Sequence, residues 1–271
     1  MSDVVTDHSA IRTPAVEVSI IAPAHNEQDN VPGLIDDVRQ AMADTGITFE
    51  MIVVNDGSTD RTESMLLNQA VQHPWLHVYR MLATPHGKGH GQSAAFHAGI
   101  RQARSELIAL MDADRQNDPA DLPKMIAMLR EKGADMVHGD RSANRRDTLV
   151  RRCSSWVGRA SRRTVLGDTI RDTGCSLRVF KREVGLALPL QYRGVHRFIP
   201  VYTRMLGYTV LETSVNHRQR AAGTAKYGIW NRAIPGLIDL FAVRWMRSRL
   251  RPVQCEPVRP AADANAARDA S

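Results

Sequence analysis

Four short apolar segments alternate with segments of helical periodicity in the first half of the chain. The apolar segments cover residues 16–22, 49–54, 76–82 and 107–111. Between them, apolar residues recur three or four positions apart, as in residues 31–42. Apolar strands that are joined by helices of about a dozen residues are typical of a parallel sheet covered by helices on both faces. We therefore predict an α/β fold with a mostly parallel sheet, which binds ligands at the carboxyl ends of its strands.

The second half of the chain has a less regular pattern. It suggests helices at about 149–166 and 196–206, a strand at 208–215, and an apolar stripe at helical spacing from Trp230 to Trp245. Such a stripe is more often part of a helix in the core, but its two tryptophans and flanking arginines match an amphipathic helix at a membrane interface. We predict a catalytic domain at 16–228, formed by a nucleotide and metal half (16–140) and an acceptor half (141–228), then an interfacial helix at 229–250, with disordered ends at 1–15 and 251–271.

Charge is unevenly distributed along the chain, whose formal net charge is +7. By count, residues 1–140 contain 11 basic and 20 acidic residues, whereas residues 141–271 contain 25 basic and 9 acidic ones. A basic half favours an anionic partner. Only 5% of the residues are aromatic, which argues against a single-stranded nucleic-acid platform. Because arginine binds phosphate in a bidentate fork, a site for one or two phosphates fits better.

Other sequence features concern the cellular compartment. No uncharged apolar stretch approaches the roughly 18 residues that a membrane-spanning helix needs, and residues 1–14 lack the features of a secretory signal. Cys153, Cys175 and Cys255 form neither a CxxC pair nor a disulfide framework. We expect a cytoplasmic chain with reduced cysteines.

Polar residues follow three of the expected strands, at 23–27, 55–60 and 112–116. Asp112 and Asp114, one residue apart, offer hard oxygen ligands to Mg²⁺ or Mn²⁺, and Gln116 adds a neutral oxygen. Such a pair also occurs in ordinary solvated loops, but here it follows a buried strand and precedes a helix cap. We predict a divalent metal site at this strand end.

Asp56 follows the second strand, where a carboxylate suits the ring N–H and the ribose hydroxyl of a nucleotide. The segment 87–94 contains GxGxxA. It follows the third strand instead of the first, so we do not interpret it as a dinucleotide fingerprint. We expect a flexible turn that approaches a ligand, with Lys88 as charge support.

Taken together, several segments resemble the family 2 glycosyltransferases of GT-A fold, and among them the polyprenyl-phosphate sugar transferases of the dolichol-phosphate mannosyltransferase type. The segments that carry the resemblance are 23–27, 54–60, 91–94, 112–116, 172–178 and 217–227. The resemblance implies nucleotide binding by Pro23, Ala24, Asn26, Glu27, Asp56, Lys88, Gly91, Gln92, Asp112 and Ala113. It implies metal binding by Asp114 and Gln116, and acceptor or phosphate binding by Arg141, Arg151, Arg152, Ser155, Arg178, Arg220 and Lys226.

The implied activity is transfer of a sugar from a UDP- or GDP-linked donor to a polyprenyl phosphate, with inversion. The catalytic residues would be Asp112, Asp114 and Asp172, with the role of Asp172 left open. The protein would work at the inner face of the membrane, and a homo-oligomer or a membrane-protein partner remains open. One alternative is a soluble family 2 enzyme that uses Asp172 as a base toward a hydroxyl acceptor; another, resting on the basic half alone, is a nucleic-acid-binding protein.

Overall fold

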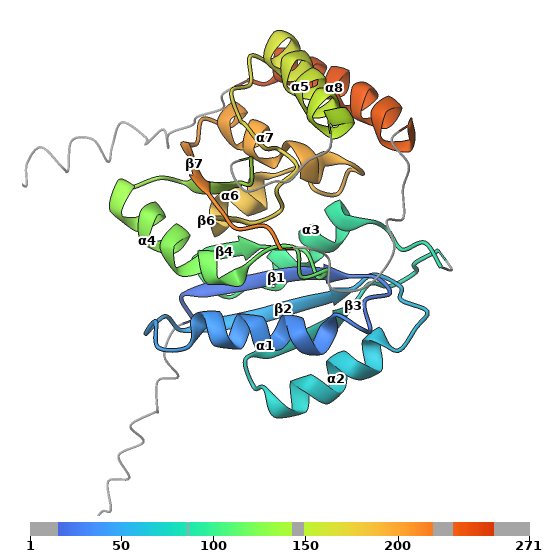
Figure 1. Cartoon of the computed structure of the whole chain (residues 1–271), viewed down its shortest axis with the longest axis vertical. Coiled ribbons are helices and arrows are strands. Elements are labelled where there is room, and N and C mark those ends of the chain that lie inside the picture. Colours follow the sequence, from blue (N-terminus) through green and yellow to red (C-terminus); the bar gives the residue numbers. More distant parts are fainter. Residues whose placement is uncertain (1–15, 86, 143–148, 219–229, 252–271) are drawn as a thin grey trace, which may run out of the picture.

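The computed structural model describes residues 16–85, 87–142, 149–218 and 230–251. For residues 149–157 and 230–235 it describes the backbone and not the side chains. Its centre is a seven-stranded sheet in the order β3-β2-β1-β4-β6-β5-β7 (Figure 1). The strands are β1 (Val18–Ala24), β2 (Phe49–Asn55), β3 (Leu76–Arg80), β4 (Leu107–Leu110), β5 (Met136–Asp140), β6 (Arg178–Lys181) and β7 (Val210–Ser214). Only β6 runs antiparallel to its neighbours β4 and β5, so β1, β2, β4, β5 and β7 end at the same edge.

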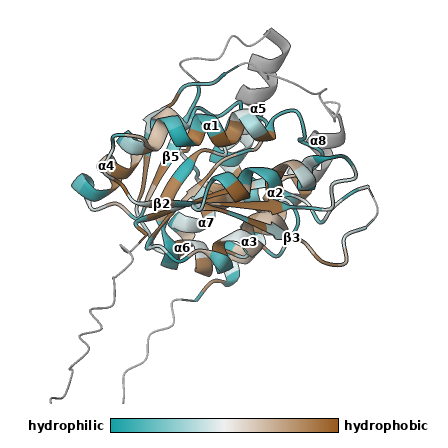
Figure 2. Cartoon of the chain, turned by 90° about the horizontal axis from the view of Figure 1, so that it is seen from below, coloured by the Kyte–Doolittle hydropathy of each residue, from teal (hydrophilic) through white to brown (hydrophobic). Residues whose placement is uncertain are grey.

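Helices cover both faces of the sheet, as Figure 2 shows from below. The helices are α1 (Val31–Met42), α2 (Thr62–Gln72), α3 (Gln92–Gln102), α4 (Leu122–Lys132), α5 (Leu149–Leu166), α6 (Arg182–Ala187), α7 (Ile199–Met205) and α8 (Trp230–Arg249), with 3₁₀ turns η1 (Pro119–Asp121) and η2 (Val195–Phe198). One buried cluster joins the sheet to α1, α2 and α4, and the other joins it to α3, α6 and α7. The predicted mostly parallel sheet between two helical layers is confirmed.

The sequence pattern missed two central strands. β5 contains His138, Gly139 and Asp140, which interrupt its apolar character although all five of its residues are buried. β6 is only four residues long and follows an irregular segment. Each of the two strands pairs with a neighbour on both sides, because β6 lies between β4 and β5, and β5 lies between β6 and β7. A periodicity argument cannot find strands whose burial is decided by their neighbours.

The two acidic residues at the start of α2, Asp60 and Glu63, do not form a capping box. Asp60 does cap the helix, because its Oδ1 accepts from Thr62 N at 2.9 Å. Glu63 instead accepts from the Asn55 side chain at 2.7 Å and pairs with Arg80. The carboxylate therefore ties α2 to β2 and β3 and does not reach back to the helix terminus.

Helices α5 and α8 lie side by side at one end of the molecule (Figure 1). Leu240 and Val243 of α8 are buried in the cluster beneath α3, α6 and α7. The opposite side of α8 exposes Leu237, Phe241 and Trp245 at intervals of four residues. Among the described residues, no helix is both long enough and apolar enough to cross a bilayer.

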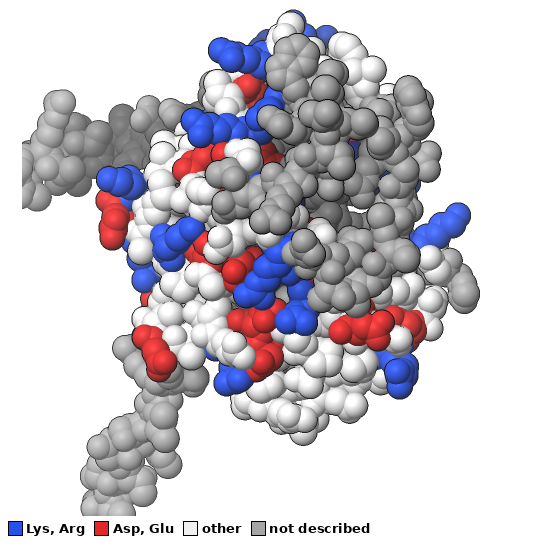
Figure 3. All heavy atoms as spheres, viewed as in Figure 1, with Lys and Arg blue, Asp and Glu red and all other residues white. Residues whose placement is uncertain are grey.

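The two halves of the chain, which differ in net charge, contribute neighbouring charges to the surface of the described residues. On the face drawn in Figure 3, acidic and basic side chains are interleaved. The reason is pairing between the two halves of the chain, for example between Arg218 and both Asp37 and Asp118, and between Lys181 and Asp135. Part of the positive charge of the second half is therefore neutralised locally.

Candidate active site

Asp112 and Asp114 follow β4 at the ligand-binding edge of the sheet. The turn is closed from within, because Asp112 N donates to Asn117 Oδ1 at 2.9 Å and Gln116 N donates to Asp114 Oδ1 at 3.1 Å. The predicted cap beyond it is present, since Asp118 accepts from Ala120 N at 3.1 Å. The two carboxylates and Gln116 are thus held on one turn.

The carboxylate of Asp112 is oriented by two neighbours. Gln92 Nε2, at the start of α3, donates to Oδ1, and Ser176 Oγ lies 2.6 Å from Oδ2. Burial, followed by the negative charge of Asp114, raises the pKa of Asp112 to about 6. The positive charges of Arg141 and Arg178 oppose that rise. Ser176 belongs to the segment that carries the family resemblance, but no local sequence pattern predicts its contact with Asp112.

This turn fits a divalent cation that completes its coordination with substrate. Mg²⁺ is usually bound through one or two carboxylates together with phosphate oxygens. Asp112, Asp114 and the Gln116 amide form that kind of oxygen donor set, and two adjacent carboxylates raise each other's proton affinity unless a cation neutralises them. Within the described residues, no cluster of three or more His, Cys, Asp or Glu side chains offers an all-protein cage.

The turns after β1 and β2 are joined to each other. Asn26 has a positive φ of 55°, and its Oδ1 accepts from Thr59 N at 2.8 Å. Glu27 N donates to Thr62 Oγ1 at 2.8 Å. Pro23 and Ala24 end β1 directly before this junction. The structure therefore places the predicted nucleotide residues of the two turns at one location.

Asp56 holds the glycine-rich turn. Its two carboxylate oxygens accept from His90 N at 2.8 Å and Gly91 N at 2.7 Å. Gly89 has a φ of +62°, and a Cβ there would lie 2.5 Å from Asp56 Oδ2, so this position requires glycine. Asp56 is only 4% exposed, while Lys88 beside it is exposed. In this structure both oxygens of Asp56, which was predicted to bind a nucleotide base, accept hydrogen bonds from the main chain of the glycine-rich turn.

Arg141 and Asp172 form a buried bidentate pair. Arg141 Nε donates to Asp172 Oδ2 at 2.7 Å and Nη2 donates to Oδ1 at 3.1 Å, with side chains 10% and 8% exposed. Burial by itself would lower the pKa of Arg141, but the hydrogen bond and charge of Asp172 raise it. His138 Nε2 lies 2.8 Å from Asp172 O. Burial lowers the pKa of His138 to about 3, so the neutral ring donates this bond.

Arg178 is buried and bonded to the main chain. It is 2% exposed, and its guanidinium donates to the main-chain oxygens of Ser176, His196 and Cys175. Burial lowers its pKa to about 10. In this structure the side chain fixes the segment that presents Ser176 to Asp112, and the phosphate contact of Arg178 stays a prediction.

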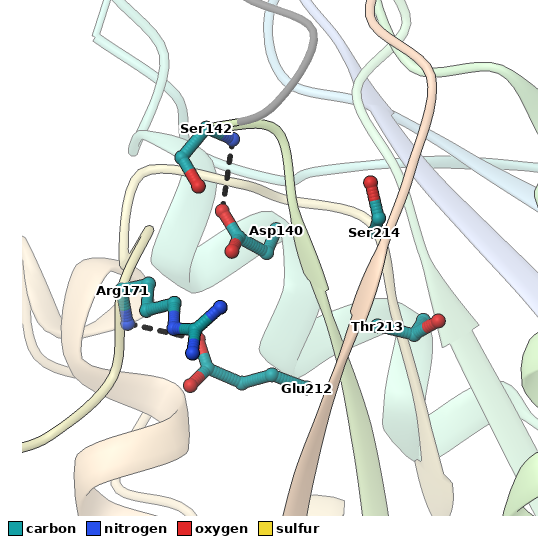
Figure 4. A pocket seen from close by; sticks show the side chains of 6 residues that line it. All are labelled: Asp140, Ser142, Arg171, Glu212, Thr213 and Ser214. Carbon is teal, nitrogen blue, oxygen red and sulfur yellow. Dashed lines mark hydrogen bonds between the residues drawn. The ribbon is translucent and has the colours of Figure 1, made fainter.

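A polar pocket of about 240 Å³ lies beyond Arg141 at the same edge of the sheet (Figure 4). It is lined by Asp140, Ser142, Arg171, Glu212, Thr213 and Ser214. Burial, with a further contribution from the charge of Asp140, raises the pKa of Glu212. Two carboxylates in its lining make this pocket unfavourable for a phosphate.

The remaining predicted acceptor residues cannot be placed in detail. Arg151, Arg152 and Ser155 belong to α5, whose side chains are described only from residue 158 onward. Arg220 and Lys226 lie outside the described residues. Among the predicted acceptor residues with described side chains, Arg178 donates to main-chain oxygens. Arg141 instead pairs with the side chain of Asp172.

Comparison with known sequences gives consistent matches. The family model of Glycosyl transferase family 2 matches residues 19–185. The chain is 34% identical over 242 residues to a dodecaprenyl-phosphate galacturonate synthase of Rhizobium johnstonii, with 88% of this chain and 70% of the relative covered. It is 33% identical over 211 residues to an undecaprenyl-phosphate 4-deoxy-4-formamido-L-arabinose transferase of Photorhabdus laumondii, with 78% and 63% covered. The chain thus spans about two thirds of the length of these relatives.

Solved structures of similar fold include a mannosyltransferase of Pyrobaculum calidifontis in complex with GDP-Man and Mn²⁺, with a TM-score of 0.62 and 20% identity over 88% of this chain and 66% of that one. A glucosyl-3-phosphoglycerate synthase of Mycobacterium tuberculosis in complex with Mn²⁺, UDP and glucosyl-3-phosphoglycerate has a TM-score of 0.61 and 19% identity over 87% and 81%. The likeness concerns the fold, and it confirms the predicted GT-A architecture.

Proposed function

Since this chain belongs to glycosyl transferase family 2, we propose that it transfers a sugar from a nucleoside diphosphate to a polyprenyl phosphate. The names of both curated relatives contain a polyprenyl phosphate, which supports this acceptor. The ligands GDP-Man and UDP in two structures of the same fold support a nucleotide-linked donor. The sugar and the base stay open.

The buried pair of Arg141 and Asp172 is the observation that favours a phosphate acceptor over a hydroxyl acceptor. A sugar or protein hydroxyl is a weak nucleophile and needs a general base. Both oxygens of Asp172, the base required by the alternative function, already accept from Arg141. A phosphate monoester has a second pKa near 6 and is largely a dianion at neutral pH, so it attacks without a base. This arrangement favours a phosphate acceptor.

In the proposed reaction, an oxygen of the acceptor phosphate attacks the anomeric carbon as the bond to the donor diphosphate breaks. The electron pair of that bond leaves with the diphosphate, and the configuration of the carbon inverts. Asp172 positions Arg141 by accepting from its Nε and Nη2. The third guanidinium nitrogen of Arg141, Nη1, has no hydrogen-bond partner among the described residues, and we propose that it binds the acceptor phosphate. In this proposal, Arg151, Arg152 and Ser155 of α5 complete the acceptor phosphate site, and Arg220 and Lys226 bind the donor diphosphate.

Asp112, Asp114 and Gln116 would hold Mg²⁺ or Mn²⁺. Such an ion neutralises the charge that grows on a leaving diphosphate. Ser176 and Gln92 keep the Asp112 carboxylate in place, in the manner of the outer hydrogen bonds around a metal site. Because Asp56 is held by the glycine-rich turn, we propose that the base binds beside that turn.

We also propose that the protein binds peripherally to the inner face of the membrane through α8. Leu237, Ile238, Phe241 and Trp245 are between 53% and 63% exposed on one side of this helix, and Arg244 is exposed beside them. Apolar side chains flanked by arginines favour insertion at the boundary of an anionic bilayer. A lipid-linked acceptor would then be presented at the end of the molecule where α5 lies.

Replacing both Phe241 and Trp245 by serine is expected to reduce binding to phosphatidylglycerol vesicles about tenfold or more, because two large apolar side chains no longer enter the bilayer. Co-sedimentation measures the bound fraction. Serine at Leu67 and Val71, which are 52% and 87% exposed on α2, is the matched control and should leave binding unchanged. Equal losses in the two double variants would exclude α8 as a specific membrane surface.

The function is tested by incubating the purified protein with Mn²⁺, a panel of nucleotide sugars and a short polyprenyl phosphate. Sugar that moves into the organic phase in the presence of one donor supports the proposal. Transfer to soluble saccharides, with none to the lipid phosphate, would favour the alternative acceptor.

A further inference from the structure

A charged cluster lies behind the turn that carries Asp114. At its centre is Asp37, on the face of α1 that is turned toward this loop. Asp37 Oδ2 accepts from Arg115 Nε at 2.9 Å and pairs with Arg218 Nη1 at 3.0 Å. The side chain of Asp37 is 14% exposed. One carboxylate oxygen thus binds guanidinium groups from two segments that are distant in sequence.

Both arginines also act on the metal turn directly. Arg115 belongs to it and has a φ of 61°, a conformation unfavourable for a residue with a side chain. Arg218 N donates to Gln116 O at 3.0 Å, and Arg218 Nη2 donates to Asp118 Oδ1 at 2.7 Å. A further bridge pairs Asn117 with His217. The turn is therefore attached on one side to α1 and on the other to residues 217–218.

Gly33 provides independent support for this arrangement. It lies one helical turn before Asp37 on α1, where glycine is less favourable for helix formation than alanine. A Cβ at Gly33 would lie 2.2 Å from Arg115 Nη1 and 2.4 Å from Arg115 Cζ. The Arg115 guanidinium thus lies against the bare backbone of α1, in space that any other residue would fill.

We propose that Asp37 is a positioning residue that fixes the turn bearing Asp114 and Gln116 through Arg115 and Arg218, and so sets the affinity for the divalent ion and the donor diphosphate. The proposal rests on the proposed function, because it requires a divalent ion at this turn. Asp37 does not touch substrate. It acts by holding a backbone conformation that the turn would not retain by itself.

The test is a titration of the full chain with Mn²⁺, followed by the electron paramagnetic resonance signal of the free ion, alone and with UDP or GDP. Asp37→Asn is expected to raise the Kd for Mn²⁺ about tenfold or more, as loss of an outer-shell partner does at other metal sites. Gly33→Ala should raise it in the same direction while the midpoint of thermal unfolding stays unchanged or increases. In steady state, the KM for Mn²⁺ should rise more than kcat falls.

Asp36→Asn is the matched control. Asp36 is the adjacent residue, and its side chain is 50% exposed and pairs with Arg39 on the surface of α1. The Asp36→Asn substitution removes the same charge as Asp37→Asn but no contact of the turn that carries Asp114. The Mn²⁺ affinity of this variant should therefore stay within about twofold of wild type. Asp37→Glu, which keeps an acceptor for both arginines, should recover part of the affinity.

The outcomes separate this proposal from the proposed function. Wild-type affinity in both Asp37→Asn and Gly33→Ala overturns the positioning role, as does an equal loss in Asp36→Asn, which would indicate a simple charge effect. If Asp114→Ala loses Mn²⁺ binding in the same experiment, the metal site stands although the positioning role has failed. A wild-type protein that binds no Mn²⁺ overturns both.

Discussion

Asp114→Ala is expected to lower kcat/KM for sugar transfer by at least about 10³-fold, which corresponds to roughly 4 kcal/mol of transition-state stabilisation. The variant loses one of two carboxylates offered to the divalent ion, at the point where charge develops on the leaving diphosphate. Its fold should persist, because the turn is also held through Asn117 and Arg218. The measurement is initial rate against donor concentration at several Mn²⁺ concentrations.

Asp29→Ala is a suitable control for this loss. Asp29 is an exposed carboxylate in the turn after β1, at the same edge of the sheet. It should transfer sugar at the wild-type rate. Unchanged turnover in Asp114→Ala would remove the metal assignment. Partial recovery of Asp114→Ala at high Mn²⁺ would instead locate the defect in ion affinity.

The second large effect is expected for Asp172→Asn, which should lower the free energy of unfolding by about 3 kcal/mol and weaken use of the acceptor. The substitution leaves Arg141 charged and buried without its partner, and breaking a buried ion pair from one side typically costs about 3–5 kcal/mol. Urea unfolding gives the stability, and the KM for polyprenyl phosphate gives the effect on acceptor binding.

Two further variants distinguish a positioning role from a base. Arg141→Met combined with Asp172→Leu should regain most of the stability, because no charge is left buried, while acceptor use stays impaired. Glu17→Gln, which breaks the exposed pair with Arg130, should cost no more than about 1 kcal/mol. If Asp172→Asn kept full stability and lost only turnover together with the acidic limb of the pH profile, Asp172 would be a base.

The residues of these two predictions differ in how clearly the sequence marks them as site residues. Asp112, Asp114 and Gln116 were singled out because an apolar strand ends just before them, and their role as metal ligands stays a prediction. Asp172 and Arg141 were both predicted site residues, but their pairing was not predicted, because Arg141 is one arginine among many in the basic half. Arg178 was assigned to phosphate through the family resemblance, and its burial cannot be read from the sequence.

What the sequence determined alone was the alternation of strands and helices and the polar residues at three strand ends. Those features follow from the continuous apolar runs of strands that are covered on both faces and from the 3.6-residue period of a helix, both of which extend over a few neighbouring positions. They suffice for the fold class and for the location of the proposed metal turn.

Only the tertiary structure decided which charges meet. Arg141 and Asp172 are 31 residues apart, Arg115 and Asp37 are 78 apart, and Arg218 and Asp118 are 100 apart. The antiparallel insertion of β6 between β4 and β5 is equally non-local. Such pairings depend on how helices and strands pack around two cores, and no local pattern encodes them, since an arginine looks the same in the sequence whether it faces water, a carbonyl or a carboxylate.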